Sequence, residues 1–131
     1  MKILIVDNDE STSVTLKALL LSKEDFEIDT AYSGQGGLDK MAEKTYDIII
    51  LDIMMPYVSG MDVCRAMNQN SRLKNIPVLL MSSAVPISPD DFHESLKKMS
   101  ELSVVKGVLE KPFVIDDLIA KIHKAVESDK A

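Results

Sequence analysis

Residues 47–60 read DIIILDIMMPYVSG, and this stretch decides the fold that we predict. Four apolar residues in a row, 48–51, precede Asp52 without any polar alternation. A short β-branched run of this kind is typical of a strand buried on both faces, which usually lies in a parallel sheet covered by helices. Ligands bind at the carboxyl ends of the strands in such sheets. Asp52 stands at such an end, either as a functional carboxylate or as an ordinary cap of the following turn.

Strand and helix patterns alternate along the rest of the chain. Strands are expected at 3–6, 26–31, 47–51, 78–81 and within 104–110, and helices at 11–22, 33–44, from 59 to at least 67, at 89–102 and from beyond 112 to about 128. Five alternations call for right-handed crossovers, and therefore for an α/β fold with a five-stranded parallel sheet and helices on both faces. The alternating segment 26–31 is expected near the sheet edge, because only one of its faces is apolar.

Apolar spacing and capping residues define the predicted helices. In the first helix, Val14, Ala18 and Leu21 are expected to form the buried face. Ser33 is the predicted cap of the second helix, and an S-x-x-D capping-box pattern begins the third helix at Ser59.

The composition limits the classes of function. The 131 residues suit one domain, and the net charge of −6 argues against a direct nucleic-acid partner. Cys64 is the only cysteine, so no internal disulfide is possible, and it is expected to pack as a small hydrophobe. The apolar run Ile3 to Val6 is too short for a signal peptide or a membrane span, so we expect a cytoplasmic protein with no membrane partner. His93 and His123 are expected to be surface residues.

Polar side chains follow four of the predicted strands. They are Asp7, Asn8 and Asp9 after the first, Asp52 after the third, Ser82 and Ser83 after the fourth, and Lys111 after the fifth. Because the strands are parallel, these ends meet at one edge of the sheet. Oxygen ligands suit Mg²⁺, a hydroxyl and an ammonium group suit phosphoryl oxygens, and a carboxylate near the metal can be the nucleophile. Taken singly, each residue also has a plain structural explanation, such as a turn aspartate or a solvated lysine.

Four motifs at these strand ends carry a resemblance to a known family. They are LIVDN at 4–8, LDIMMP at 51–56 with Gly60, VLLMS at 78–82, and EKPF at 110–113. With them, almost the whole chain resembles the receiver domain of two-component response regulators. The resemblance implies a flavodoxin-like (βα)5 receiver fold over residues 1–128, a short tail at 129–131, and no output domain in this chain.

The resemblance also implies a phosphoacceptor site. Asp52 would take a phosphoryl group from a phosphohistidine on a sensor histidine kinase or a histidine phosphotransfer protein. The metal ligands would be Asp7, Asn8, Asp52 and the backbone carbonyl of Met54, with Asp9 as a further candidate, while Ser82 and Lys111 would contact the phosphoryl oxygens. Such a protein is not an enzyme in the usual sense, although it assists its own phosphorylation and dephosphorylation. A cis peptide between Lys111 and Pro112 is expected to aim the lysine.

Three features depart from the pattern of the family. Asn8 replaces an acid, which predicts weaker Mg²⁺ binding. Val108 stands where the family usually has an aromatic switch residue, so Ser82 can move toward the phosphoryl group but Val108 cannot rotate to follow it. The segment between Ser82 and Lys111 is longer than expected. We therefore expect the signal to reach a downstream protein partner through the helix region 84–102 and the fifth strand.

Two other functions fit part of the pattern. A haloacid-dehalogenase-like phosphatase would use Asp7 as the nucleophile and Asp9 as the general acid, but further metal-binding acids and room for a substrate-closing cap are missing. A flavodoxin-like FMN carrier would need a phosphate-binding loop after the first strand, where the acidic sequence DNDES would repel phosphate.

Overall fold

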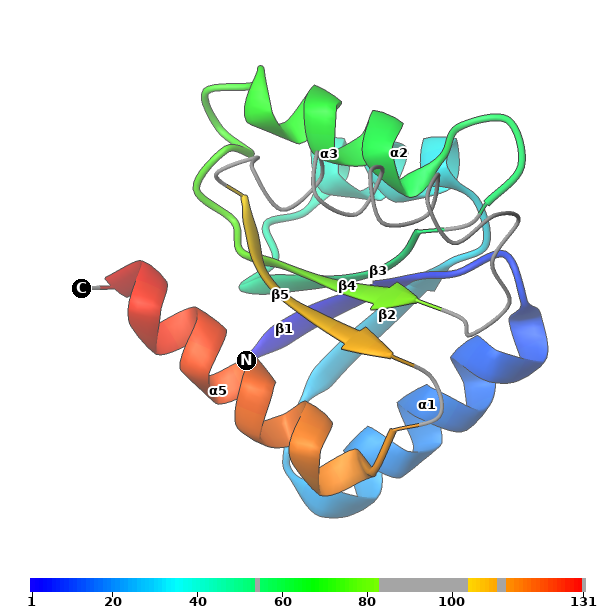
Figure 1. Ribbon diagram of the computed structural model, residues 1–131, viewed down its shortest axis with the longest axis vertical. Helices are drawn as coiled ribbons and strands as arrows, with labels where there is room; N and C mark the ends of the chain where they lie inside the picture. Colours follow the sequence, from blue (N-terminus) through cyan, green and yellow to red (C-terminus); the bar gives the residue numbers. More distant parts are fainter. Residues whose placement is uncertain (54, 83–103, 111–112, 131) are drawn as a thin grey trace.

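The computed structural model describes residues 1–53, 55–82, 104–110 and 113–130, which contain one five-stranded parallel sheet (Figure 1). Its strands are β1 (Lys2–Val6), β2 (Glu27–Ala31), β3 (Ile48–Asp52), β4 (Val78–Ser82) and β5 (Val105–Glu110), in the spatial order β2-β1-β3-β4-β5. The helices are α1 (Glu10–Lys23), α2 (Gly34–Glu43), α3 (Gly60–Asn68) and α5 (Ile115–Lys130). The predicted α/β fold is confirmed, with the alternating segment at the sheet edge. The expected helix at 89–102 and the Lys111–Pro112 peptide lie outside the described residues.

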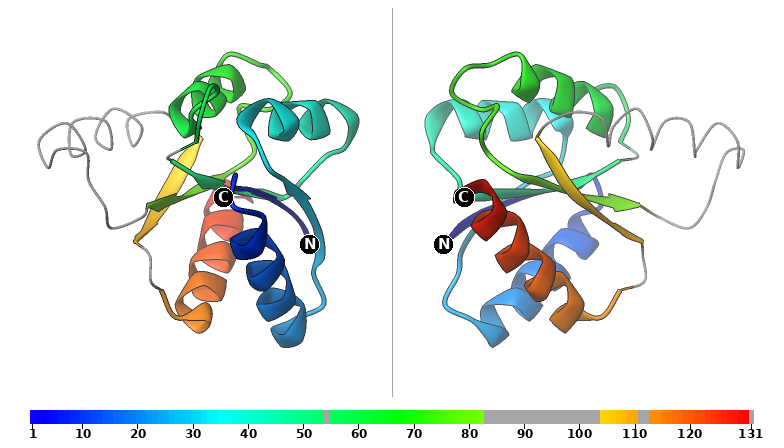
Figure 2. Two further views of the ribbon diagram at one scale, coloured as in Figure 1. Left: turned by 90° about the vertical axis from the view of Figure 1, so that its right-hand side faces the viewer. Right: turned by 60° about the vertical axis from the view of Figure 1, so that its left-hand side comes forward.

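Alternate residues of the inner strands separate the core into two layers. Ile3, Ile5, Ile48 and Ile50 pack with α1 and α5, whereas their sequence neighbours in β1 and β3 pack with α2 and α3. Figures 1 and 2 show these two pairs of helices on opposite faces of the sheet. All four isoleucines are fully buried, as expected for strands that are covered on both sides.

The buried face of α1 differs from our prediction. Val14 and Leu21 are 54 % and 45 % exposed, and Ala18 is exposed as well. The buried residues are instead Ser13, Leu16 and Leu20. The prediction was wrong because apolar residues occur all around this helix, so their spacing does not select one face. The buried face is selected by a contact of the folded chain. Ser13 faces inward, and its Oγ donates a hydrogen bond of 3.5 Å to the carbonyl of Asp7.

Two predicted caps are confirmed. Ser33 caps α2 by accepting a hydrogen bond from the Gly36 amide, and Ser59 begins α3 with a reciprocal capping box. Within α2, a Cβ atom on Gly37 would lie 2.8 Å from a methyl carbon of Val6, so glycine lets this helix approach β1 closely. A side chain at this position would force the helix and the strand apart.

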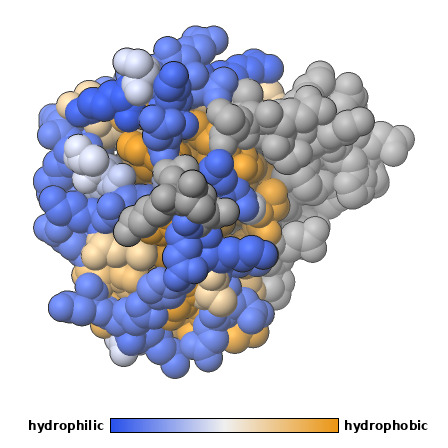
Figure 3. Space-filling view, turned by 90° about the vertical axis from the view of Figure 1, so that its left-hand side faces the viewer, coloured by the Kyte–Doolittle hydropathy of each residue, from blue (hydrophilic) through white to orange (hydrophobic). Residues whose placement is uncertain are grey.

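Helix α3 buries Cys64 and Met67 on its inner face. Burial raises the pKa of the Cys64 thiol to about 12. The thiol is therefore protonated and unreactive near neutral pH, which agrees with the prediction that it packs as a small hydrophobe. On the face of the molecule that Figure 3 shows, most coloured side chains are hydrophilic, with apolar patches between them.

A polar cluster ties the edge strand β2 to the chain segment before β3. The Tyr46 hydroxyl donates a hydrogen bond of 2.7 Å to Asp29, and the Lys44 ammonium lies 3.2 Å from the same carboxylate oxygen. The hydrogen bond from Tyr46 is the main cause that holds the pKa of Asp29 below its ordinary value of 3.8, with Lys44 adding to it. Burial and the same hydrogen bond raise the pKa of Tyr46.

We predict that Tyr46→Phe lowers the free energy of unfolding by about 1 kcal/mol at neutral pH, because it removes this charge-assisted hydrogen bond. A carboxylate with a depressed folded-state pKa stabilises the fold above its unfolded pKa and loses that effect as pH falls through the folded value. The difference between variant and wild type should therefore shrink below about pH 4. Urea unfolding at neutral and acidic pH measures it.

Tyr32→Phe is the matched control. The Tyr32 hydroxyl accepts a hydrogen bond of 3.3 Å from Thr30 at an exposed site, so its loss should change stability by less than about 0.5 kcal/mol. An equal loss for Tyr46→Phe at neutral and acidic pH would show that packing, and not the charged hydrogen bond, carries the effect.

Candidate functional site

The pairing of β1 with β3 brings two carboxylates together at one edge of the sheet. The register aligns Val6 with Leu51, so the next residue of each segment, Asp7 and Asp52, lies beside the other on strands that run about 5 Å apart. Strand alternation places both on the same face of the sheet. Asp7 is 1 % exposed and Asp52 is 6 % exposed. Two acids that are 45 positions apart in sequence thus form one buried acidic pair.

The backbone holds Asp7 in a defined position. Its amide donates to the Ala31 carbonyl at 3.0 Å, and its Oδ1 accepts a hydrogen bond of 2.9 Å from the Asp9 amide. Asp9 is the N-cap of α1, where its side chain accepts from the Thr12 amide at 3.3 Å. Asn8 lies between them and is exposed. The three residues of this loop therefore have different surroundings, and Asp7 is the buried one.

Gly60 allows α3 to begin directly against Asp52. A Cβ atom at this position would lie 2.7 Å from the Asp52 carbonyl oxygen and 2.8 Å from the Ile53 Cα, both of which are backbone atoms. The Gly60 amide also donates to the Ile53 carbonyl at 3.1 Å. The glycine in the sequence motif therefore has a packing role that its position alone did not reveal.

The loop between β3 and α3 contains a feature that sequence reasoning missed. Tyr57 has a φ of 65°, and among the described residues it is the only non-glycine residue with a positive φ. Its side chain is fully exposed, at 101 %. Because tyrosine is an uncommon choice for the left-handed region, no propensity argument could have identified this conformation from the sequence.

The structure describes only some of the other predicted site residues. Ser82 ends β4, one residue after Met81, which pairs with Asp52, so its backbone reaches the same edge of the sheet. Met54 and Lys111 lie outside the described residues. Val108 pairs with Leu80 and packs half-buried on the α2 and α3 side of the sheet. The roles of these residues remain predictions.

His123 lies at the surface, as predicted, but it also has a carboxylate partner. Its Nε2 lies 2.8 Å from Glu24, and its ring lies 6.3 Å from the ring of Phe26. Glu24 is 99 positions away, so helical spacing could not have revealed the pair.

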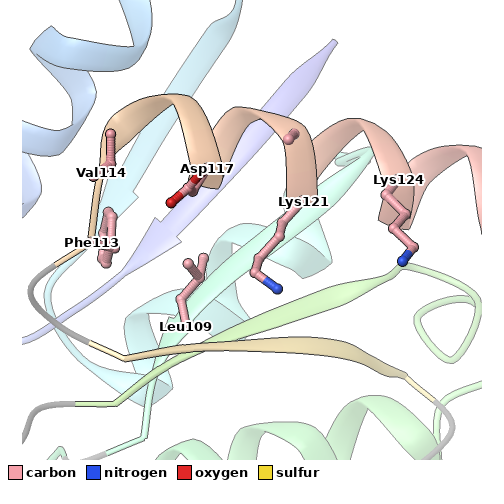
Figure 4. A pocket seen from close by; sticks show the side chains of 7 residues that line it. Leu109, Phe113, Val114, Asp117, Lys121 and Lys124 are labelled. Carbon is pink, nitrogen blue, oxygen red and sulfur yellow. The ribbon is translucent and has the colours of Figure 1, made fainter.

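A cavity of about 530 Å³, whose lining includes neither Asp7 nor Asp52, lies between β5 and α5 (Figure 4). Its lining residues are Leu109, Phe113, Val114, Asp117, Ala120, Lys121 and Lys124. Among the described residues, no helix is long and apolar enough to span a membrane.

Comparison with known proteins agrees with this geometry. The response regulator receiver domain family matches residues 3–123. Among solved structures, the chain is 27 % identical to chemotaxis protein CheY4 of Vibrio cholerae, with a TM-score of 0.79 over 95 % of this chain and 97 % of that chain. A sensor protein from Polaromonas sp. JS666 is 26 % identical, with a TM-score of 0.84 over 98 % and 97 % of the two chains.

Curated relatives include the response regulator ArlR of Staphylococcus aureus, which is 32 % identical over 123 residues. That alignment covers 93 % of this chain and 51 % of ArlR, so the chain spans about half the length of the curated relatives it matches. The family match over residues 3–123 includes both members of the acidic pair and all five strands apart from Lys2. The chain belongs to the response regulator receiver domain family of two-component systems.

Proposed function

We propose that Asp52 accepts a phosphoryl group from a phosphohistidine on a sensor histidine kinase or a histidine phosphotransfer protein. The observation that carries this proposal is the buried pair of Asp7 and Asp52 on adjacent strand ends of a receiver fold. In the transfer, a carboxylate oxygen of Asp52 forms a bond to phosphorus as the bond between phosphorus and the imidazole nitrogen breaks. The rigid strand supplies orientation, which is most of what this reaction needs from a protein.

Mg²⁺ is the cofactor that we propose for this step. Mg²⁺ sites commonly use one or two carboxylates together with phosphate oxygens, and the donor set of Asp7 and Asp52 fits that description. Among the described residues, no group of three or more histidine, cysteine or acidic side chains is placed to hold a metal. Bound Mg²⁺ would neutralise charge between the carboxylates and the phosphoryl group. Met54 would add a carbonyl oxygen, and Asp9 is a further candidate.

The remaining groups at the site would act on the phosphoryl oxygens. Ser82 would donate a hydrogen bond from its hydroxyl, and Lys111 would contribute a positive charge. The backbone position of Ser82 at the end of β4 supports its part in this proposal. Asp7 would hold the metal and not act as the nucleophile, in contrast to the phosphatase interpretation.

We predict that Asp52→Asn abolishes phosphorylation by acetyl phosphate in the presence of Mg²⁺, because an amide is a poor nucleophile. Intact-mass measurement should find one added phosphoryl group on wild type and none on the variant. Asp25→Asn, which removes an exposed carboxylate, is the matched control and should label like wild type. Equal labelling of Asp52→Asn and wild type would contradict the proposal, and labelling that depended on Asp7 alone would favour the phosphatase interpretation.

We predict that Asn8→Asp tightens Mg²⁺ binding by about tenfold, because it adds a negative charge near the metal. Chelation of Mg²⁺ should prevent labelling of both proteins. Asn75→Asp is the matched control, since it changes the net charge equally at an exposed position before β4, at the opposite end of the strands. Unchanged affinity in a Mg²⁺ titration of Asn8→Asp would show that residue 8 does not face the metal.

The downstream partner is proposed to dock on the helix region 84–102 and β5. Two observations support the choice of β5: it is one of the two edge strands of the described sheet, and the cavity against α5 leaves room beside it (Figure 4). Val108 is too small and too stiff at χ1 to act as a rotating gate, so the signal would pass through the neighbouring segment.

We predict that beryllofluoride with Mg²⁺ changes hydrogen exchange within 84–102 and in β5, because the mimic adds charge and acceptor oxygens at Asp52. Asp52→Asn treated in the same way should show no change. If protection changes only around Asp7 and in residues 52–60, while 84–102 stays silent, the proposed output surface is wrong.

A further inference from the structure

Tyr57 combines two features that are individually unfavourable. Its backbone adopts a φ of 65°, in the left-handed region where the Cβ atom crowds the backbone. Its ring is fully exposed to solvent, at 101 %. Glycine at this position would avoid the backbone strain and would expose no aromatic surface.

Within the described part of the chain, no hydrogen bond to the Tyr57 hydroxyl and no ring contact of Tyr57 offsets these costs. The only aromatic ring contact there joins Phe26 to His123. The loop nevertheless imposes its conformation, since the Ile53 amide donates to the Met81 carbonyl at one end and the Gly60 amide closes the other. When the surrounding structure holds a residue in a strained backbone conformation, that residue often belongs to a functional site.

The position of the loop indicates which molecule would use this ring. Gly60 contacts the backbone of Asp52 and lies three positions after Tyr57, so the Tyr57 Cα lies within about 11 Å of that contact. A protein that brings a phosphoimidazole to Asp52 must place its own surface against this edge of the sheet. The exposed ring therefore lies where a donor protein has to dock.

We propose that Tyr57 is an aromatic anchor for the protein that donates the phosphoryl group, and that its ring enters an apolar recess beside the phosphohistidine of that donor. This inference rests on the proposed function of Asp52. Tyrosine is enriched among the residues that dominate binding at protein interfaces, because a rigid ring buries a large area at little entropic cost. The left-handed backbone of Tyr57 holds the ring outward before the donor arrives.

The test compares a protein donor with a small-molecule donor. The protein donor is the autophosphorylated histidine kinase of the source organism that labels the wild-type chain fastest, and the small molecule is acetyl phosphate. Tyr57→Gly should lower kcat/KM for transfer from the kinase by at least about tenfold, as expected when a central interface residue is removed. It should leave the rate of labelling by acetyl phosphate within about twofold of wild type, since acetyl phosphate does not need the ring.

Two control variants and one stability measurement separate a loss of docking from structural damage. Tyr57→Phe keeps the ring and should transfer at close to the wild-type rate. Leu21→Ala removes another exposed apolar side chain, near the C-terminal end of α1 and so away from this edge of the sheet, and it should also behave like wild type. The thermal midpoint of Tyr57→Gly should not fall, because glycine accepts the left-handed backbone.

Several results would overturn the inference. The first is transfer from the kinase to Tyr57→Gly at the wild-type rate, the second is equal slowing with both donors, and the third is a matching loss in Leu21→Ala. If acetyl phosphate labels wild type but no kinase does, the phosphohistidine source and the Tyr57 anchor fail together. If neither donor labels Asp52, the proposed function itself fails.

Discussion

The parallel pairing of β1 with β3 is the constraint on which the rest of this structure depends. One register decides both the core and the site: it aligns four pairs of buried apolar residues, and the next residue of each segment is an acid. A shift by one residue would send the apolar side chains to the opposite layers and would separate Asp7 from Asp52. The strand register that the apolar core stabilises therefore also sets the geometry of the acidic pair.

Close backbone approaches then fix the segments around that pair. Gly37 lets α2 lie against Val6 in β1, and Gly60 lets α3 begin against the Asp52 carbonyl. Ser59 completes the second contact with its capping box, so the loop that carries Tyr57 is held at both ends. Rigid supports of this kind suit a reaction in which positioning and charge neutralisation do most of the work.

Sequence reasoning succeeded where a local pattern has only one physical solution. The unbroken apolar run before Asp52 required a strand covered on both faces, and the caps at Ser33 and Ser59 require only residues within the same turn. It failed for α1, where apolar residues surround the helix and the contact of Ser13 with Asp7 selects the buried face. It also missed the partner of His123, because Glu24 belongs to a distant part of the chain.

The sequence by itself determined the order of strands and helices along the chain, the apolar runs of the strands, and the acids at the ends of β1 and β3, because these depend on local periodicity and residue chemistry. Only the tertiary structure decided that Asp7 lies beside Asp52 with both buried, and that Tyr57 adopts a left-handed backbone. Strand register, burial and loop closure arise from contacts between distant segments. No local pattern specifies them, so they become definite only when the sheet assembles.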